Sequence, residues 1–355
     1  MRVVTKFRCG VVAAVAVVGL ASNAAYAADP GSLDNHPSPP QPPQISASGN
    51  AHDNMISAQV GAVVFDQSKN GKGSSTGPLR PVIDWTPPAC WFAPTYTPAQ
   101  FKDYWTNQQL PGNTDQSYVK FIYDRYQNGH PYKNWNLDKT GKGYWWTIVF
   151  NPDTNYINAD PNTGNITACY TTDGFWADTK QQPTEPNALN PQILSALAYA
   201  QLRVPTISVS LSPSGKQTVN LNTWAWLDKT TLKPVSVTAS VPAIGISATT
   251  TATPVALHID PGTPNATVYP ASGDCPINPD GSIGTPYQPA DGNNIPPCGL
   301  TYLHATTGGS PYPLRATITW KISWTGTNNT GGTLPNGIFG ATTPLRVQEI
   351  QTVVR

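Results

Sequence analysis

The sequence predicts a mainly β protein: a C-terminal antiparallel β-sandwich preceded by a small aromatic-rich α+β domain. Three observations support this class. The chain has 37 prolines, 29 glycines and only 12% charged residues, a composition that favours strands and loops over long helices. Tryptophan and tyrosine are concentrated between residues 82 and 189. After Pro205, apolar and polar residues alternate with a period of two, which is the period of half-buried strands.

Residues 1–27 have the three-part pattern of a secretory signal peptide. Basic residues open the chain, an apolar run covers residues 11–20, and Ala25-Tyr26-Ala27 forms a small-residue cleavage motif. The apolar run is too short to span a bilayer. We therefore expect the mature chain to begin near Ala28 and to be secreted or associated with the cell surface.

The charge balance argues against anionic polymers as partners. The formal net charge is +1, and no Lys/Arg cluster gives the electrostatic footprint of a nucleic-acid or anionic-membrane binder. No apolar run after the signal peptide reaches the roughly 18 to 20 residues that a transmembrane helix needs. We expect no nucleic acid, no membrane span and no cofactor; the expected partner is another envelope protein or a wall polysaccharide.

Four cysteines follow the signal peptide, namely Cys90, Cys169, Cys275 and Cys298. An even number in an exported chain predicts two disulfides. Of the three connectivities, Cys90–Cys169 with Cys275–Cys298 respects the predicted domain boundary. None of the four belongs to a CxxC pair, so zinc is the weaker interpretation. Six prolines between Cys275 and Cys298 predict a loop without regular structure.

The N-terminal half is predicted to contain a leader and an aromatic domain. Residues 28–81 are rich in Pro, Ser and Gly and predict a flexible leader, apart from a short strand at residues 59–65. Residues 82–189 form the α+β domain. In it, Thr97-Pro98 begins a short helix, and residues 143–152 and 165–172 each form a strand.

A connecting helix and the sandwich are predicted to follow. Asn190-Pro191 begins the helix, which spans residues 190–204 and ends before Pro205. Residues 205–355 form the sandwich. Its last strand begins at Leu345, with a bulge near Glu349. The clearest predicted strands are residues 206–211, 235–241, 254–259 and 316–324.

Catalytic motifs lack the context that they need. Gly73-Ser74-Ser75-Thr76-Gly77 matches a GxSxG nucleophile motif, but that motif requires a strand before it and a helix after it. Polar linker sequence flanks it here, which favours a linker. Glycoside cleavage usually needs two carboxylates close together, and Glu185 and Glu349 are the chain's two glutamates; an aspartate pair remains an alternative, but no segment identifies one. We assign no catalytic residue from these motifs.

Two further polar features have ordinary structural explanations. The loop at residues 151–165 is rich in oxygen ligands and is a candidate for calcium, but Asn, Asp, Pro and Gly together also make an ordinary turn. His258 alternates with Leu257 and Ile259 in a strand, so it is expected to be a satisfied structural or solvent-facing group rather than a ligand. We expect no metal ion.

Three segments resemble a group of exported actinobacterial proteins: residues 218–228 (TVNLNTWAWLD), 235–254 and 298–326. The C-terminal part of those proteins is similar to a PKD-like, immunoglobulin-like sandwich. The resemblance covers roughly Cys90 to Val354 and carries over no catalytic residue. It implies a turn at Asp260 and Gly262, which only partly match the motif of the family, and a corner aromatic at Tyr302.

Trp224, Trp226 and Asp228 are the candidate binding residues. The two indoles have the same parity, so in a strand they point to one side, with Asn222 and Asp228. If that side is inward, they pack in the core and face Trp320 and Trp324; packing in the core or at a domain interface is the interpretation that we favour. If it is outward, they form a stacking platform of the kind that binds sugar rings.

Three functions remain open on the sequence alone. We favour an exported non-catalytic cell-envelope or secreted interaction protein. A carbohydrate- or cell-wall-binding module is the alternative. A hydrolase of unrecognised type is the second alternative, for which Asp124, His130 and Asp138 are the nearest constellation in the aromatic domain.

Overall fold

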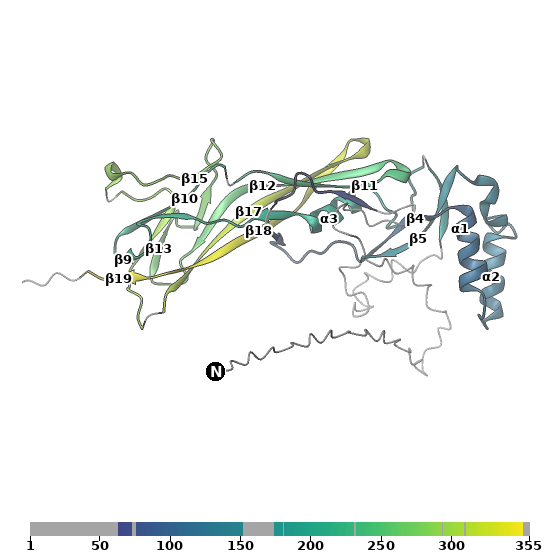
Figure 1. Ribbon diagram of the computed structural model, residues 1–355, viewed down its shortest axis with the longest axis horizontal. Coiled ribbons are helices and arrows are strands. Elements are labelled where there is room, and N and C mark those ends of the chain that lie inside the picture. The colour runs from purple at the N-terminus through teal and green to yellow at the C-terminus, as the bar shows by residue number, and fades with distance from the viewer. Residues whose placement is uncertain are drawn as a thin grey trace, which may run out of the picture. The chain divides into compact units, whose positions relative to one another are not determined.

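The computed structural model describes residues 63–72, 76–151, 174–179, 181–230, 232–292, 294–308 and 310–350. These residues form antiparallel β-sheets with a few short helices, so the prediction of a mainly β protein is confirmed (Figure 1). Among them, no helix is both long and apolar enough to cross a membrane.

The larger sheet has seven strands, and three long ones form its centre. These are β12 (Ile246–Asp260), β17 (Tyr312–Gly326) and β18 (Thr330–Leu345). β17 and β18 form a hairpin closed by the 3-10 turn η8 (Thr327–Asn329). The remaining strands are β1 (Val64–Asp66), β3 (Arg80–Pro81), β11 (Val235–Val241) and β14 (Asp274–Pro276). The 3-10 turn η6 (Pro242–Ile244) joins β11 to β12.

The predicted alternation is confirmed in β17. Ala316, Ile318 and Trp320 are buried, whereas Arg315 and Lys321 are exposed. The period-two pattern therefore marked the buried face of the sheet correctly. In β12 the register shifts between Pro254 and Ala256, next to a proline that has no N–H for the ladder.

The smaller sheet has five short strands that pack on the larger sheet. They are β8 (Ser210–Ser212), β10 (Asn222–Leu227), β13 (Ala266–Tyr269), β15 (Ile283–Gly284) and β16 (Gly299–Tyr302). Their inward side chains, such as Ala225 and Leu300, share one hydrophobic cluster with Leu257 and Ile318 of the larger sheet. Burial of this shared apolar surface holds the two sheets together.

Tyr302 connects the two sheets. Its hydroxyl donates to the carbonyl of Pro261 at 3.1 Å, and its ring stacks on Tyr312 at 5.3 Å. The acceptor lies 41 residues earlier in the chain, whereas the tyrosine corner of immunoglobulin-like domains bonds a few residues upstream. The turn expected at Asp260 is present, because its carboxylate accepts from the Gly262 N–H at 2.9 Å.

Helix α3 (Pro191–Gln201) lies on the larger sheet, and the predicted helix is confirmed. The Asn190 side chain accepts from the Ile193 N–H at 2.9 Å and supplies the N-cap. The helix packs on β11, β12, β17 and β18. Thr250 of β12 donates to the Ser195 carbonyl at 2.8 Å, a buried link between helix and sheet.

A three-stranded sheet separates two hydrophobic cores. It consists of β4 (Cys90–Tyr96), β5 (Gly143–Phe150) and β6 (Phe175–Asp178). Trp146 belongs to the main cluster, and the adjacent Trp145 belongs to a second, aromatic cluster. Successive side chains of a strand point to opposite faces, so neighbouring tryptophans can serve different cores. The predicted strand at residues 143–152 is confirmed by β5.

Short helices cover the aromatic cluster. They are α1 (Pro98–Asp103), the π-helix η1 (Tyr104–Gln109), α2 (Gln116–Tyr126) and the 3-10 segment η2 (Asn134–Lys139). Thr97 caps α1 through a capping box with Gln100, as its sequence signal predicts. Phe101 and Trp145 stack at 4.2 Å, and the Trp145 indole N–H donates to the Trp135 carbonyl at 3.0 Å.

The C-terminal part of the predicted leader is structured, which corrects that prediction. β1 pairs with β11 and β3 pairs with β18, while β2 (Thr76–Pro78) pairs with β7 (Arg203–Pro205). Asn70 is buried. Its side-chain amide donates a hydrogen bond to the Gln201 carbonyl, and its side-chain oxygen accepts one from the Arg203 N–H. Composition predicted disorder because the segment has few apolar residues to bury. A polar, proline-rich segment can nevertheless form backbone hydrogen bonds at the edge of a sheet.

The C-terminal strand also differs from its prediction. Leu345 ends β18, and β19 (Val347–Gln348) instead pairs in parallel with β9 (Gln217–Thr218). The chain therefore changes sheets at Arg346, and Ile350 is exposed beyond the strand. Ile350 lies outside any strand, so its position in the alternating pattern does not require a bulge at Glu349.

The main cluster extends across the predicted domain boundaries at residues 189 and 205. It contains Trp91 of the aromatic segment, Leu194 of α3 and Val237 of the larger sheet. Several predictions fall outside the described residues: the signal peptide, Ser75, the strand at residues 165–172, the Cys169 end of the first disulfide and the calcium candidate beyond Asn151.

Candidate functional site

The candidate binding residues lie on β10, at the centre of the smaller sheet. Ala225 and Leu227 point inward and belong to the main hydrophobic cluster. Because side chains alternate along a strand, Trp224 and Trp226 point to the opposite, outer face. Trp224 is buried, but not against the Trp320/Trp324 row, so that part of the inward interpretation is wrong.

Trp224 is covered from outside the sheet by the loop that follows β15. Only 5% of the residue is exposed, and the Tyr287 ring meets the indole edge-on at 5.8 Å. Its register neighbours are Gly299 and Ser212, which leave room for the ring. The indole Nε1 is buried and has no hydrogen-bond partner. Trp224 is therefore an anchor for the loop with one unused donor.

Trp226 lies beside Trp224 on the same face and is partly exposed. Its register neighbours, Gly284 and Ser210, are also small. Gly284 has a φ of 65°, and a Cβ there would collide with the Ala225 carbonyl oxygen. Only glycine allows β15 to approach β10 this closely. Trp224 is buried under the loop, whereas Trp226 remains partly exposed.

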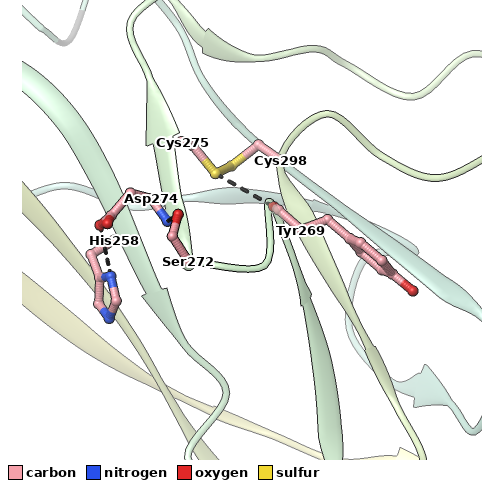
Figure 2. A network of polar contacts seen from close by, with 6 residues as sticks. All are labelled: His258, Tyr269, Ser272, Asp274, Cys275 and Cys298. Carbon is pink, nitrogen blue, oxygen red and sulfur yellow. Dashed lines mark hydrogen bonds and ion pairs between the residues drawn. A yellow bond between two sulfur atoms is a disulfide. The ribbon is translucent and has the colours of Figure 1, made fainter.

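A disulfide fastens both ends of the covering loop. The predicted Cys275–Cys298 bond is confirmed, with a Cα–Cα distance of 5.5 Å (Figure 2). The enclosed loop is not devoid of regular structure, which corrects that prediction: it contains β15 and the 3-10 turn η7 (Pro289–Asp291). Backbone pairing with β10 supplies order that the proline count does not reveal.

Asn222 and Asp228, at the two ends of β10, have different roles. The Asn222 amide donates to the Asn294 carbonyl at 3.0 Å, and its oxygen accepts from Thr301 at 2.6 Å. Asn222 therefore holds the loop. Asp228 is exposed, and its carboxylate accepts from the Thr230 N–H at 2.8 Å. That hydrogen bond lowers the pKa of Asp228, which favours the anionic form of this side chain two residues after Trp226.

Lys229 and Asp280 add charge near Asp228. The Asp280 pKa is lowered, first by the side-chain hydrogen bond from Ser282 and then by that from the Ser282 backbone. Lys229 lowers the pKa of both carboxylates through its charge, and Asp280 raises that of Asp228. The segment that follows β10 therefore carries charges of both signs, close in sequence to the partly exposed Trp226.

His258 occupies the solvent side of β12, as expected. Its Nδ1 lies 2.8 Å from an Asp274 carboxylate oxygen, and both side chains are about half exposed, at 47% and 57% (Figure 2). The Asp274 N–H donates to the Ser272 hydroxyl at 3.2 Å. The pair links β12 to β14 beside the disulfide, which is a structural role.

Asp124, His130 and Asp138 are not joined by any side-chain hydrogen bond. The Asp124 carboxylate accepts from the Asn128 amide at 2.9 Å, while the His130 and Asp138 side chains are exposed. Within the part of the chain that the structure describes, no three His, Cys, Asp or Glu residues are grouped so that they could hold a metal.

Comparison with protein-family models, with curated proteins and with solved structures finds no match to this chain. The site is therefore defined by its own geometry. Sequence reasoning found the two indoles but missed Tyr287, Gly284 and Gly299. The sequence signal for the two glycines was their position, Gly284 inside the disulfide loop and Gly299 directly after it, and that position does not say which strand the loop covers.

Proposed function

We propose that this protein is an exported interaction protein that acts at the cell envelope or after secretion by binding rather than by chemistry. The observation that carries the proposal is Trp226, a partly exposed indole on the outer sheet face, two residues before the exposed Asp228 carboxylate. The neighbouring strand β15, which pairs with Trp226, belongs to the loop that the disulfide closes. A preorganised aromatic anchor beside charge is typical of binding surfaces.

A PKD-like, immunoglobulin-like sandwich is the scaffold that we propose for this surface. Two antiparallel sheets with a shared hydrophobic cluster support the assignment. The resemblance of residues 218–228 and 298–326 supports it too. Export is supported by the signal-peptide pattern of residues 1–27. In such sandwiches, loops at the sheet ends are common sites of recognition.

Capture from the surface of the cells that produce the protein tests the proposal. The tagged mature chain is crosslinked there and purified with its partner. We expect Trp226→Ala to reduce capture at least about tenfold, because indoles dominate binding energy in many interfaces. Phe121→Ala, which removes an exposed aromatic on α2, is the matched control and should capture normally. Equal capture by the two variants would contradict the proposal.

A wall polysaccharide is the second candidate partner, and the same indole favours it. Trp226 offers an apolar ring face, and the carboxylate two residues later can accept hydrogen bonds from sugar hydroxyls. Co-sedimentation with protease-treated wall polysaccharide separates this candidate from a protein partner. Sedimentation that depends on Trp226 supports the carbohydrate; capture that disappears after protease treatment of the wall supports the protein.

A further inference from the structure

Among the residues that the structure describes, few pair with the outer edge of β18. β17 pairs along one side of this strand, but on the other side β3 pairs only with Gly337 and Ile338. Val82 adds one bond, from its N–H to the Asn336 carbonyl at 2.9 Å. Between Ile338 and the end of β18, the outer edge has no backbone partner among the described residues. Gly340 and residues 342–344 are exposed.

Two prolines show which backbone groups face this open edge. Pro313 and Pro344 are register partners, and because neither has an N–H they form a non-hydrogen-bonded pair. Such pairs alternate with hydrogen-bonded ones, so Thr342 and Gly340 are also non-hydrogen-bonded to β17. Their N–H and C=O groups point outward. Ile338 is two residues before Gly340, so its backbone groups should point to the same side. Its pairing with β3 on the outer edge agrees with this assignment.

The edge is uncharged but has cations at both ends. No residue of β18 is charged, although natural proteins usually protect open edges with charge or cover them. Arg80 and Arg346 flank the open window and are exposed, and neither forms an ion pair within the described ranges. Arg315, opposite Thr342, has a 63% exposed side chain, with Asp260 at 3.9 Å.

We propose that the window from Gly340 to Pro344 binds an extended acidic peptide segment of a partner protein as an added β-strand. Main-chain hydrogen bonds to Gly340 and Thr342 would supply affinity, and carboxylates near Arg80 and Arg346 would supply specificity. This rests on the proposed function in that the protein acts by binding, but it uses a surface other than Trp226.

A second copy of the chain fits the window less well. Antiparallel pairing about Thr342 would bring Arg346 of one copy opposite Ile338 of the other, where Arg80 already lies. Like charges placed together oppose such a dimer. The window is also bounded at Leu345, where the chain leaves for β19. A five-residue contact of this kind suits a peptide segment better than a dimer interface.

Peptide binding to the full mature chain tests the inference by fluorescence anisotropy. The probe is a labelled peptide of alternating glutamate and valine; a lysine and valine peptide is the charge control. Thr342→Pro removes one open N–H without removing a bond to β17, and Thr342→Val retains it. We expect Thr342→Pro to weaken acidic-peptide binding about tenfold or more, and Thr342→Val and Trp226→Ala to leave it unchanged.

Three results would overturn the inference. One is equal binding of the acidic and basic peptides, and another is equal binding to the proline and valine variants. The third is a dimer of the protein that Thr342→Pro dissociates, which would assign the edge to a second copy. If Thr342→Pro does not fold, the wild-type chain is tested with the acidic peptide N-methylated on alternate residues. Undiminished binding of that peptide would exclude strand addition.

Discussion

Trp224 shows how a single buried donor without an acceptor affects stability. Its indole is 5% exposed and its Nε1 has no partner. Trp224→Ala should cost about 3 to 5 kcal/mol in the free energy of unfolding, because it leaves a large cavity under the loop. Trp224→Phe should cost clearly less, since it keeps an aromatic ring and removes the unpaired donor. Urea unfolding followed by circular dichroism measures both, and equal losses would contradict this view.

Burial of the Tyr199 hydroxyl makes the free energy of unfolding depend on pH in the alkaline range. Burial raises its pKa from 10.0 to about 12, so the folded state keeps the phenolic proton when the unfolded chain releases it. The stability that this difference contributes is complete below pH 10 and is lost as the pH rises from 10 to 12.

Tyr199→Phe separates this effect from hydrogen bonding, because the Tyr199 hydroxyl is buried without a partner. We expect little change in the free energy of unfolding at pH 7 and a shallower loss between pH 10 and 12. Denaturation at several pH values measures both quantities. An unchanged slope in that alkaline range would show that Tyr199 does not contribute to it.

The disulfide-closed loop is an element whose order depends on a covalent link and on pairing with β10. Cys275 and Cys298 are 23 residues apart in sequence and both are buried. In the chain-entropy model, a loop of this size contributes roughly 3 kcal/mol. The double variant Cys275→Ala/Cys298→Ala should lose about that free energy of unfolding in oxidising buffer. A double variant as stable as the wild type would show that the pairing of β15 alone holds the loop.

The edge strands β1 and β3 show why the polar segment before residue 82 matters for the whole molecule. They pair at opposite edges of the larger sheet, and Asn70 joins the segment between them to Gln201 and Arg203. Removing residues 28–81 should therefore lower the free energy of unfolding by roughly 2 kcal/mol from the hydrogen bonds of Asn70 alone. Removing residues 28–62 should lower it much less. Thermal unfolding compares the two; equal melting temperatures would contradict the assignment.

The sequence by itself determined the local features of this protein. The mainly β class, the alternation of β17, the caps at Thr97 and Asn190, and the Cys275–Cys298 bond were all predictable. Each depends on residues close together in sequence, or on composition, because periodicity and capping are local physics.

Only the tertiary structure decided which side of β10 is the inside. Parity placed Trp224 and Trp226 together but could not say which face the core would occupy. That choice follows from packing against the larger sheet, and the cover over Trp224 follows from Tyr287, 63 residues away. The open edge of β18 likewise exists because β3 ends its pairing at Ile338. Such pairings join distant segments, and their free energy depends on the whole set of neighbours.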